Sequence, residues 1–184
     1  MALTESYMLP LDTKAPVFSL QNVSSGSLET LDQLKGSTGT LVVFMCNHCP
    51  YVVHLLDALL AIAKEFAQKG VNTIGISSNS ILSHPQDGPD EMKKLALEKN
   101  FPFPYLYDET QEVAKSYDAA CTPDFYIFDE NLQSIYHGQL DDSRPGNGKP
   151  LTGKDIRNAL NNLLDNKPVL KSQKPSVGCG IKWK

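Results

Sequence analysis

Two cysteines separated by two residues are the clearest candidates for chemistry in this sequence. Cys46-Asn47-His48-Cys49-Pro50 follows an apolar run of strand length and precedes a segment with helical spacing. Free amides and the dipole at a helix N-terminus stabilise a thiolate and lower its pKa. The thiolate is the attacking species in disulfide exchange. We therefore expect Cys46, at an exposed mouth, to attack, and Cys49, one turn further in, to resolve the mixed disulfide.

His48 lies directly before the second cysteine. An imidazole that stabilises the thiolate also stabilises the reduced form and raises the reduction potential. We favour this redox-tuning role over that of a solvated surface histidine, because the motif places the ring beside the thiols. His54, His84 and His137 have no such context, and we expect them to be structural.

The motif lies at the centre of a predicted strand, helix and strand. Residues 40–45 form a continuous apolar run typical of a strand buried on both faces. Leucines at three- and four-residue steps predict a helix over residues 50–69, with Pro50 in its first turn and Gly70 at its end. Residues 71–76 predict the next strand, which completes a right-handed βαβ unit.

The rest of the chain adds strands and helices around this unit. We expect an N-terminal hairpin of residues 17–20 and 27–31, a loop over 78–90 and an antiparallel hairpin of 124–128 and 133–137. Further elements are a helix over 90–100 capped by Asp90, a strand over 104–108, a helix over 110–117 and a helix from Thr152 to Leu164. This order predicts an α/β fold with a mixed central sheet flanked by helices.

Composition excludes several classes of protein. The chain has 184 residues, of which 41% are hydrophobic and 21% charged, as in globular domains. A net charge of −4 argues against a nucleic-acid partner, and no apolar run is long enough for a membrane span. Residues 1–20 lack the basic start and apolar run of a secretion signal. We therefore expect a cytoplasmic protein, in a compartment where structural disulfides are rare.

The charge is unevenly distributed along the chain. Residues 165–184 contain five lysines and one acid, which leaves a net charge of −8 on residues 1–164. We predict one domain over 1–164 and a basic strap over 165–184 that packs on the same domain. Electrostatic docking on the protein's own surface is favoured over a binding arm for an anionic partner.

These motifs resemble the thioredoxin-like superfamily. A C-x-x-C motif beside a βαβ unit is its signature, and Cys121-Thr122-Pro123 precedes a strand where the superfamily has a cis-proline facing the cysteines. The resemblance implies that Pro123 is cis and that Thr122 and Pro123 line the substrate groove. Over residues 15–184, including the closing Gly-Cys-Gly-Ile-Lys-Trp-Lys, the chain is similar to small redoxin-domain proteins of the alkyl hydroperoxide reductase and thiol-specific antioxidant (AhpC/TSA) branch.

The resemblance implies a thiol–disulfide oxidoreductase without an organic cofactor. Its partners would be protein or small-molecule disulfides and a cellular thiol reductant, such as a thioredoxin or glutathione system. The predicted strand Leu41–Phe44 offers no acid to assist Cys49, so that water or His48 would have to accept its proton.

Two alternative functions remain open. A peroxiredoxin-like thiol peroxidase would place a threonine three residues before its reactive cysteine, but Val43 holds that position before Cys46. A copper- or zinc-binding module would use Cys46, Cys49 and His48, although a second C-x-x-C pair is missing. We therefore expect no metal at the site.

Two roles are open for each of Cys121 and Cys179. Cys121, two residues before Pro123, is either an additional redox thiol or a small packed residue. Cys179 lies between Gly178 and Gly180 in the strap. It is either a third thiol brought to the Cys46–Cys49 pair or a packed tail cysteine, and the second role is favoured.

Overall fold

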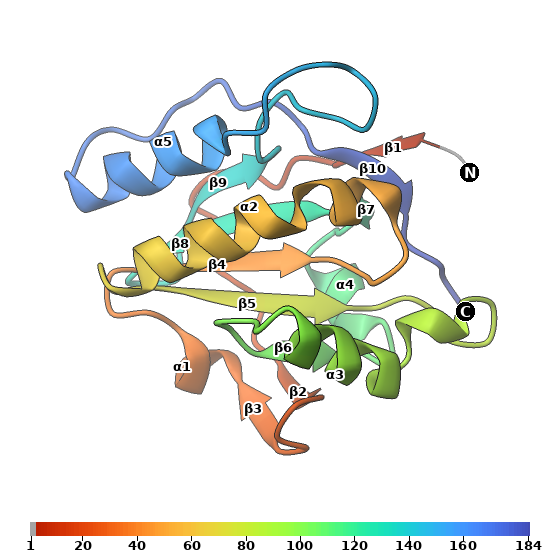
Figure 1. Ribbon diagram of the computed structural model, residues 1–184. Coiled ribbons are helices and arrows are strands. Elements are labelled where there is room, and N and C mark those ends of the chain that lie inside the picture. Colours follow the sequence, from red (N-terminus) through yellow and green to blue (C-terminus); the bar gives the residue numbers. More distant parts are fainter. Residues whose placement is uncertain (1–2) are drawn as a thin grey trace.

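A computed structural model describes residues 3–184 (Figure 1). Met1 and Ala2, which open the segment predicted to lack a secretion signal, lie outside the described residues. None of the helices formed by residues 3–184 combines the length and the apolar character needed to cross a membrane.

A seven-stranded mixed sheet forms the centre of the molecule, in the order β3-β2-β6-β5-β4-β8-β9. β4 runs parallel to β5 and antiparallel to β8, and the predicted hairpins are present as the antiparallel pairs β2–β3 and β8–β9. The strands are β2 (Ser19–Asn22), β3 (Leu28–Thr30), β4 (Gly39–Phe44), β5 (Val71–Ser77), β6 (Tyr105–Tyr107), β8 (Asp124–Asp129) and β9 (Ser134–Gly138).

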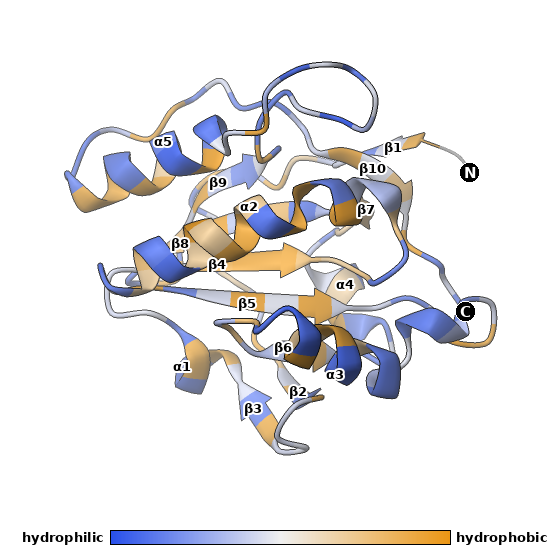
Figure 2. Ribbon diagram, viewed as in Figure 1, coloured by the Kyte–Doolittle hydropathy of each residue, from blue (hydrophilic) through white to orange (hydrophobic). Residues whose placement is uncertain are grey.

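Helices cover both faces of this sheet (Figure 1). They are α1 (Leu31–Leu34), α2 (Pro50–Ala67), α3 (Pro89–Glu98), α4 (Glu112–Ser116) and α5 (Lys154–Leu164), with a 3₁₀ turn, η1, at Pro85–Asp87. Leu41 and Val43 of β4 pack in the core beneath α2, α3 and α5, whereas Val42 and Phe44 pack in the core beneath α1 and α4. This strand is therefore buried on both faces, as its apolar run predicts, and Figure 2 shows it as an apolar stretch under α2.

A second, three-stranded sheet was not predicted from the sequence. It contains β1 (Leu3–Glu5), β10 (Val177–Gly180) and β7 (Cys121–Thr122), with β10 antiparallel to both neighbours. Lys174 of the tail forms an ion pair with Asp142, and the hydroxyl of Ser176 donates to the carbonyl oxygen of Gly138. The tail, residues 165–184, thus packs along residues 1–164 as far as β10, which pairs with β7.

The caps of two helices differ from the predictions. α3 begins at Pro89 with Gly88 as its N-cap, so that Asp90 lies in the first turn instead of capping it. α5 begins at Lys154 with Gly153 as its N-cap, and Thr152 is therefore not the cap. Oδ2 of Asp141 accepts from the amides of Thr152 and Gly153, just before the helix, at 2.7 and 2.6 Å. The carbonyl oxygen of Leu140 accepts from the first-turn amides of Asp155 and Ile156, and thus does the work expected of the Thr152 hydroxyl.

Candidate functional site

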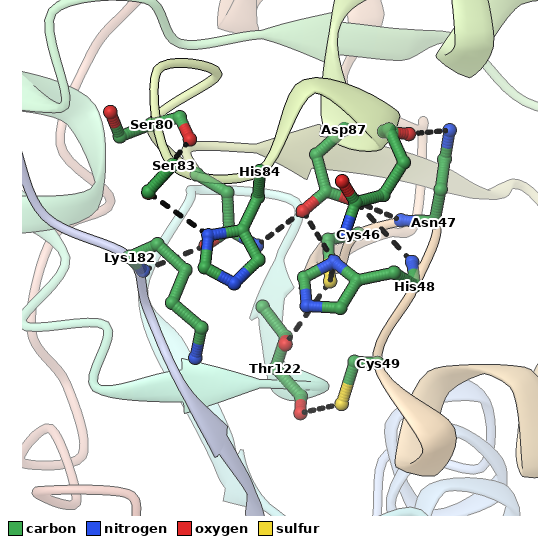
Figure 3. Close-up of polar contacts among 12 residues, drawn as sticks. Cys46, Asn47, His48, Cys49, Ser80, Ser83, His84, Asp87, Thr122 and Lys182 are labelled. Atoms are coloured by element: carbon green, nitrogen blue, oxygen red, sulfur yellow. Dashed lines mark hydrogen bonds and ion pairs between the residues drawn. The ribbon is translucent and has the colours of Figure 1, made fainter. Parts of the chain in front are cut away.

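The cysteine motif lies where β4 meets α2, as predicted. β4 ends at Phe44, Cys49 is the N-cap of α2, and Pro50 occupies the first helical position. Both thiols are free. The expectation that Cys46 lies at an exposed mouth is wrong, because Cys46 is only 1% exposed and Cys49 is 0% exposed. Thr122 of β7 contacts the Cys46 sulfur, and Asp87, at the end of η1, binds the backbone of the motif (Figure 3).

Thr122 contacts both cysteines. Its hydroxyl oxygen lies 3.5 Å from Sγ of Cys46, and its carbonyl oxygen accepts a hydrogen bond from the Cys49 thiol at 3.1 Å (Figure 3). The peptide bond between Thr122 and Pro123 is cis, so the prediction for Pro123 is confirmed. The structure thus brings Cys46, Cys49 and Thr122 together from β4, α2 and β7.

The two thiols share a hydrogen bond and titrate together. That bond is the largest cause lowering the pKa of Cys49 to about 4, with Cys179, the Val52 amide and Thr122 as further donors. The same bond, followed by burial and by the charge of Asp87, raises the pKa of Cys46. At neutral pH the pair therefore holds one proton and one negative charge. The charge is shared between the two sulfur atoms through this bond. In the arrangement where the Cys49 thiol donates to the Thr122 carbonyl oxygen, the charge lies on Cys46, as the predicted role of Cys46 requires.

We expect a thiolate of the reduced chain to titrate far below the ordinary cysteine pKa of about 8.5. Ultraviolet absorbance of the thiolate as a function of pH measures this, with the denatured chain as the reference. Cys46→Ala removes the donor that contributes most to lowering the pKa of Cys49, so the low step should move upward. A step that stays in place in Cys46→Ala would contradict this assignment of the cause.

Asp87 is a functional candidate that the sequence analysis missed. It is 0% exposed and ends η1. Its Oδ1 accepts from the amides of Asn47 and His48 at 2.9 and 3.3 Å, and its Oδ2 accepts from Nδ2 of Asn79 at 2.8 Å. Oδ2 also lies 2.6 Å from Nδ1 of His48. One carboxylate therefore holds both the backbone of the motif and the histidine ring (Figure 3).

His48 lies between Asp87 and Cys46. Its Nδ1 is 3.8 Å from Sγ of Cys46, so the ring faces the thiol as predicted. Its Nε2 is buried and has no hydrogen-bond partner among the described residues. The ring of His84 stacks on that of His48, with centroids 4.7 Å apart. His84, expected from the sequence to be structural, therefore lies in the site against His48.

The other two histidines lie away from the thiols. His137 is fully buried, where its Nδ1 accepts from the amide of Leu9 at 2.5 Å and its Nε2 lies 3.0 Å from Oδ1 of Asp124. Nε2 of His54 lies 2.9 Å from the hydroxyl of Ser143. These contacts join segments distant in sequence, which is a structural role.

Cys121 and Cys179 lie in neighbouring strands but in different surroundings. The Cys121 thiol donates to the carbonyl oxygen of Pro123 at 3.7 Å, and burial, followed by the charge of Asp124, raises its pKa. Cys179 of β10 shares a hydrogen bond with Cys49 and is 4% exposed. The structure thus brings Cys179 to the pair, contrary to the role favoured from the sequence.

Among residues 3–184, one group of side chains could hold a metal ion. The ligand atoms of Cys46, His48 and Asp87 lie within 4.8 Å of one another. Two ligands of a tetrahedral zinc ion, each bonded at about 2.0–2.1 Å, stand about 3.3 Å apart. The 2.6 Å separation of the His48 and Asp87 atoms is shorter and fits a hydrogen bond. The arrangement therefore favours a hydrogen-bonded pair over a metal centre.

A cleft of about 220 Å³ opens beside His48. It lies between the cysteine motif and α3, and it combines acidic, basic and amide side chains. The lining residues are Asn47, His48, Gln86, Glu91, Lys94, Leu95 and Glu98. The cleft thus adjoins the motif at Asn47 and His48, and neither cysteine lines it.

The family follows from a comparison of the sequence with family profiles. The profile of the AhpC/TSA family matches residues 11–136, which include the cysteine motif and Thr122-Pro123. The chain belongs to the AhpC/TSA family. An uncharacterised conserved protein from Geobacillus kaustophilus is 54% identical to this AhpC/TSA protein, with a TM-score of 0.98 over 100% of this chain and 97% of the other.

More distant comparisons identify the fold. The thioredoxin domain of a thiol-disulfide oxidoreductase from Bacteroides vulgatus is 18% identical, with a TM-score of 0.63 over 83% of this chain and 99% of that domain. The predicted thioredoxin-like fold is therefore confirmed. The mitochondrial peroxiredoxin PRX1 of Saccharomyces cerevisiae is 27% identical over 128 residues, or 69% of this AhpC/TSA chain and 48% of the yeast protein. The chain thus spans about half the length of that relative.

Proposed function

We propose that this AhpC/TSA protein is a thiol–disulfide oxidoreductase that uses Cys46 and Cys49. The observation that carries the proposal is the hydrogen-bonded thiol pair at the N-terminus of α2, held against the cis bond between Thr122 and Pro123. The pair carries a negative charge at neutral pH, and disulfide exchange requires a thiolate and a second thiol within bonding reach.

Cys46 attacks the substrate in this mechanism. A proton passes along the sulfur–sulfur hydrogen bond from Cys46 to Cys49, whose thiol then donates to the Thr122 carbonyl oxygen. The charge now on Cys46 faces the Thr122 hydroxyl and Nδ1 of His48. Cys46 attacks one substrate sulfur and releases the other as a thiolate. Cys49 then attacks Cys46, which frees the second substrate thiol and leaves a Cys46–Cys49 disulfide.

The cleft beside His48 suits polar, extended disulfide substrates. Glu91, Lys94 and Glu98 line it with charges of both signs, which match the charges of a peptide or of a small peptide-like disulfide. A cellular thiol reductant then restores the dithiol. Because both sulfur atoms are buried, the substrate reaches them only after a local rearrangement around the pair.

His48 adjusts the reduction potential in this proposal. His48→Gln removes the ring that faces the Cys46 sulfur, so the thiolate and hence the reduced form become less stable. Because Nδ1 of the ring lies 2.6 Å from Asp87 and 3.8 Å from the Cys46 sulfur, its contact with the sulfur is the weaker of the two. We assign this contact about 0.5–1.5 kcal/mol, as for an ordinary hydrogen bond, so the potential of this two-electron couple should fall by roughly 10–30 mV. Equilibration with glutathione buffers measures it. His84→Gln is the control, because His84 stacks on His48. Equal shifts in both variants would remove the specific role of His48.

Turnover assays test the proposed function. The reduced chain should reduce oxidised glutathione or a protein disulfide in many turnovers when a thiol reductant is supplied. Transfer of electrons to peroxide alone, with neither disulfide reduced, would contradict the proposal.

A thiol peroxidase is the second candidate, because the AhpC/TSA profile matches and because the yeast relative is a peroxiredoxin. In that case Cys46 would attack a peroxide oxygen, and Cys49 would convert the sulfenic acid to a disulfide with release of water. Consumption of micromolar peroxide without another thiol protein distinguishes the two activities.

A further inference from the structure

We propose that Cys179 is a third redox thiol, which exchanges into the Cys46–Cys49 disulfide to form a Cys49–Cys179 disulfide and release Cys46. The proposal rests on the proposed dithiol function and extends it to the tail. β10 pairs with β7 in a register that places Cys179 opposite Thr122.

That register directs the Cys179 side chain toward the site. Residues directly opposite each other in an antiparallel pair point to the same face. The Thr122 hydroxyl lies 3.5 Å from Sγ of Cys46, so this face of β7 is the one that meets the thiol pair. Cys121 is one residue away and therefore points to the opposite face, where its thiol meets the Pro123 carbonyl oxygen. Register thus distinguishes Cys179 from Cys121.

The neighbouring glycine brings β10 close enough for the exchange. A Cβ atom at Gly178 would lie 2.0 Å from the carbonyl oxygen of Thr122, so no other residue permits this approach. That same carbonyl accepts from the Cys49 thiol at 3.1 Å. Cys49 and Cys179 accordingly share a hydrogen bond. Figure 3 shows Cys49 directed at the Thr122 carbonyl, and Figure 1 shows β10 beside β7.

The exchange balances without an external oxidant. The Cys179 sulfur attacks Sγ of Cys49 in the Cys46–Cys49 disulfide, so one sulfur–sulfur bond forms and another breaks. The electron pair of the broken bond leaves on Sγ of Cys46, which takes up the proton lost by Cys179. The chain as a whole keeps its oxidation state, while Cys46 is again a thiol and β10 is tied to α2.

The surroundings of Cys179 keep it inactive in the reduced chain. Burial, followed by the hydrogen bond and the charge of Cys49, raises the pKa of Cys179 to about 12. Once Cys49 is part of a disulfide, its charge is absent and this contribution disappears. Cys179 therefore becomes a better nucleophile after the pair has been oxidised.

Disulfide mapping tests the proposal on the full chain. Reduced protein is oxidised with oxidised glutathione, quenched in acid and alkylated after denaturation, and its peptides are identified by mass spectrometry. Wild type should give Cys49–Cys179 beside Cys46–Cys49, with alkylated Cys46 accompanying the former. Cys179→Ala should lose alkylated Cys46 from the oxidised chain by tenfold or more.

Cys121→Ala is the matched control, because it removes a buried thiol from the opposite face of β7; it should still form Cys49–Cys179. Circular dichroism establishes that each variant is folded. Absence of Cys49–Cys179 from folded wild type overturns the inference. Disulfide turnover with Cys46–Cys49 as the sole linkage would overturn this inference alone, and Cys49–Cys179 without turnover would overturn the proposed function alone.

Discussion

Replacing Cys46 with serine should lower the rate of disulfide reduction by at least about 10³-fold. A serine hydroxyl fills almost the same space, but it does not ionise near neutral pH and forms no sulfur–sulfur bond. Initial rates with oxidised glutathione, measured through the oxidation of a coupled reductant, give this ratio. Because Cys46 is buried and the substitution is nearly isosteric, the loss should come without unfolding.

Cys121→Ser is the control for loss of a buried thiol in general. Cys121 is 0% exposed and thus as buried as Cys46 and Cys49, but its thiol contacts Pro123 and not Cys46. We expect its effect on the rate to be small beside that of Cys46→Ser. A Cys46→Ser chain that retains its rate would show that Cys49, with the lower pKa in the resting chain, is the attacking residue.

Replacing Asp87 with alanine should destabilise the chain by about 3–5 kcal/mol, the usual cost of breaking a buried pair. The substitution leaves the amides of Asn47 and His48 and the side chain of Asn79 without their acceptor. It also frees the His48 ring, and misplacement of a positioned group costs about 10²-fold in rate. Denaturant unfolding and disulfide turnover measure the two effects.

Two further variants separate positioning from stability. Asp87→Asn keeps the shape and one acceptor oxygen, so it should recover stability more than rate. Loss of the carboxylate charge should also lower the pKa of Cys46, because that charge contributes to raising it. Asp90→Ala removes an exposed carboxylate three residues away and should change neither property. A normal rate and pH profile in Asp87→Asn would leave Asp87 with a structural role only.

Most of the central sheet could be predicted because its elements carry strong local patterns. The apolar run of β4 and the run of regularly spaced leucines in α2 are long enough that the buried faces of both elements can be predicted from the sequence. The strands β1, β7 and β10 have two to four residues each, too few to show alternation. Their pairing depends on the tail returning to the site, which no local pattern of residues 165–184 indicates.

The site was predictable only in part for the same reason. Cys46, His48 and Cys49 lie within four residues of the sequence, so their spacing alone indicated thiol chemistry. Asp87 lies in the loop that follows β5. β5 is parallel to β4, so both strands end at the same edge of the sheet, and this position is the only feature of the sequence that indicates a place near the motif. A carboxylate of that loop could therefore have been predicted to lie near the motif. The position of Cys179 could not, because it depends on the register of β10 against β7.

Capture of a substrate by the Cys49→Ser chain is the most direct test of the proposed mechanism. Without Cys49, the thiol that resolves the mixed disulfide on Cys46 is missing, and the hydrogen bond of Cys179 is to Cys49 and not to Cys46. Incubation of the reduced variant with oxidised glutathione, followed by acid quenching and peptide mass spectrometry, should find one glutathione on Cys46. A free Cys46, with glutathione absent or carried by Cys121 or Cys179, would contradict the assignment of Cys46 as the attacking thiol.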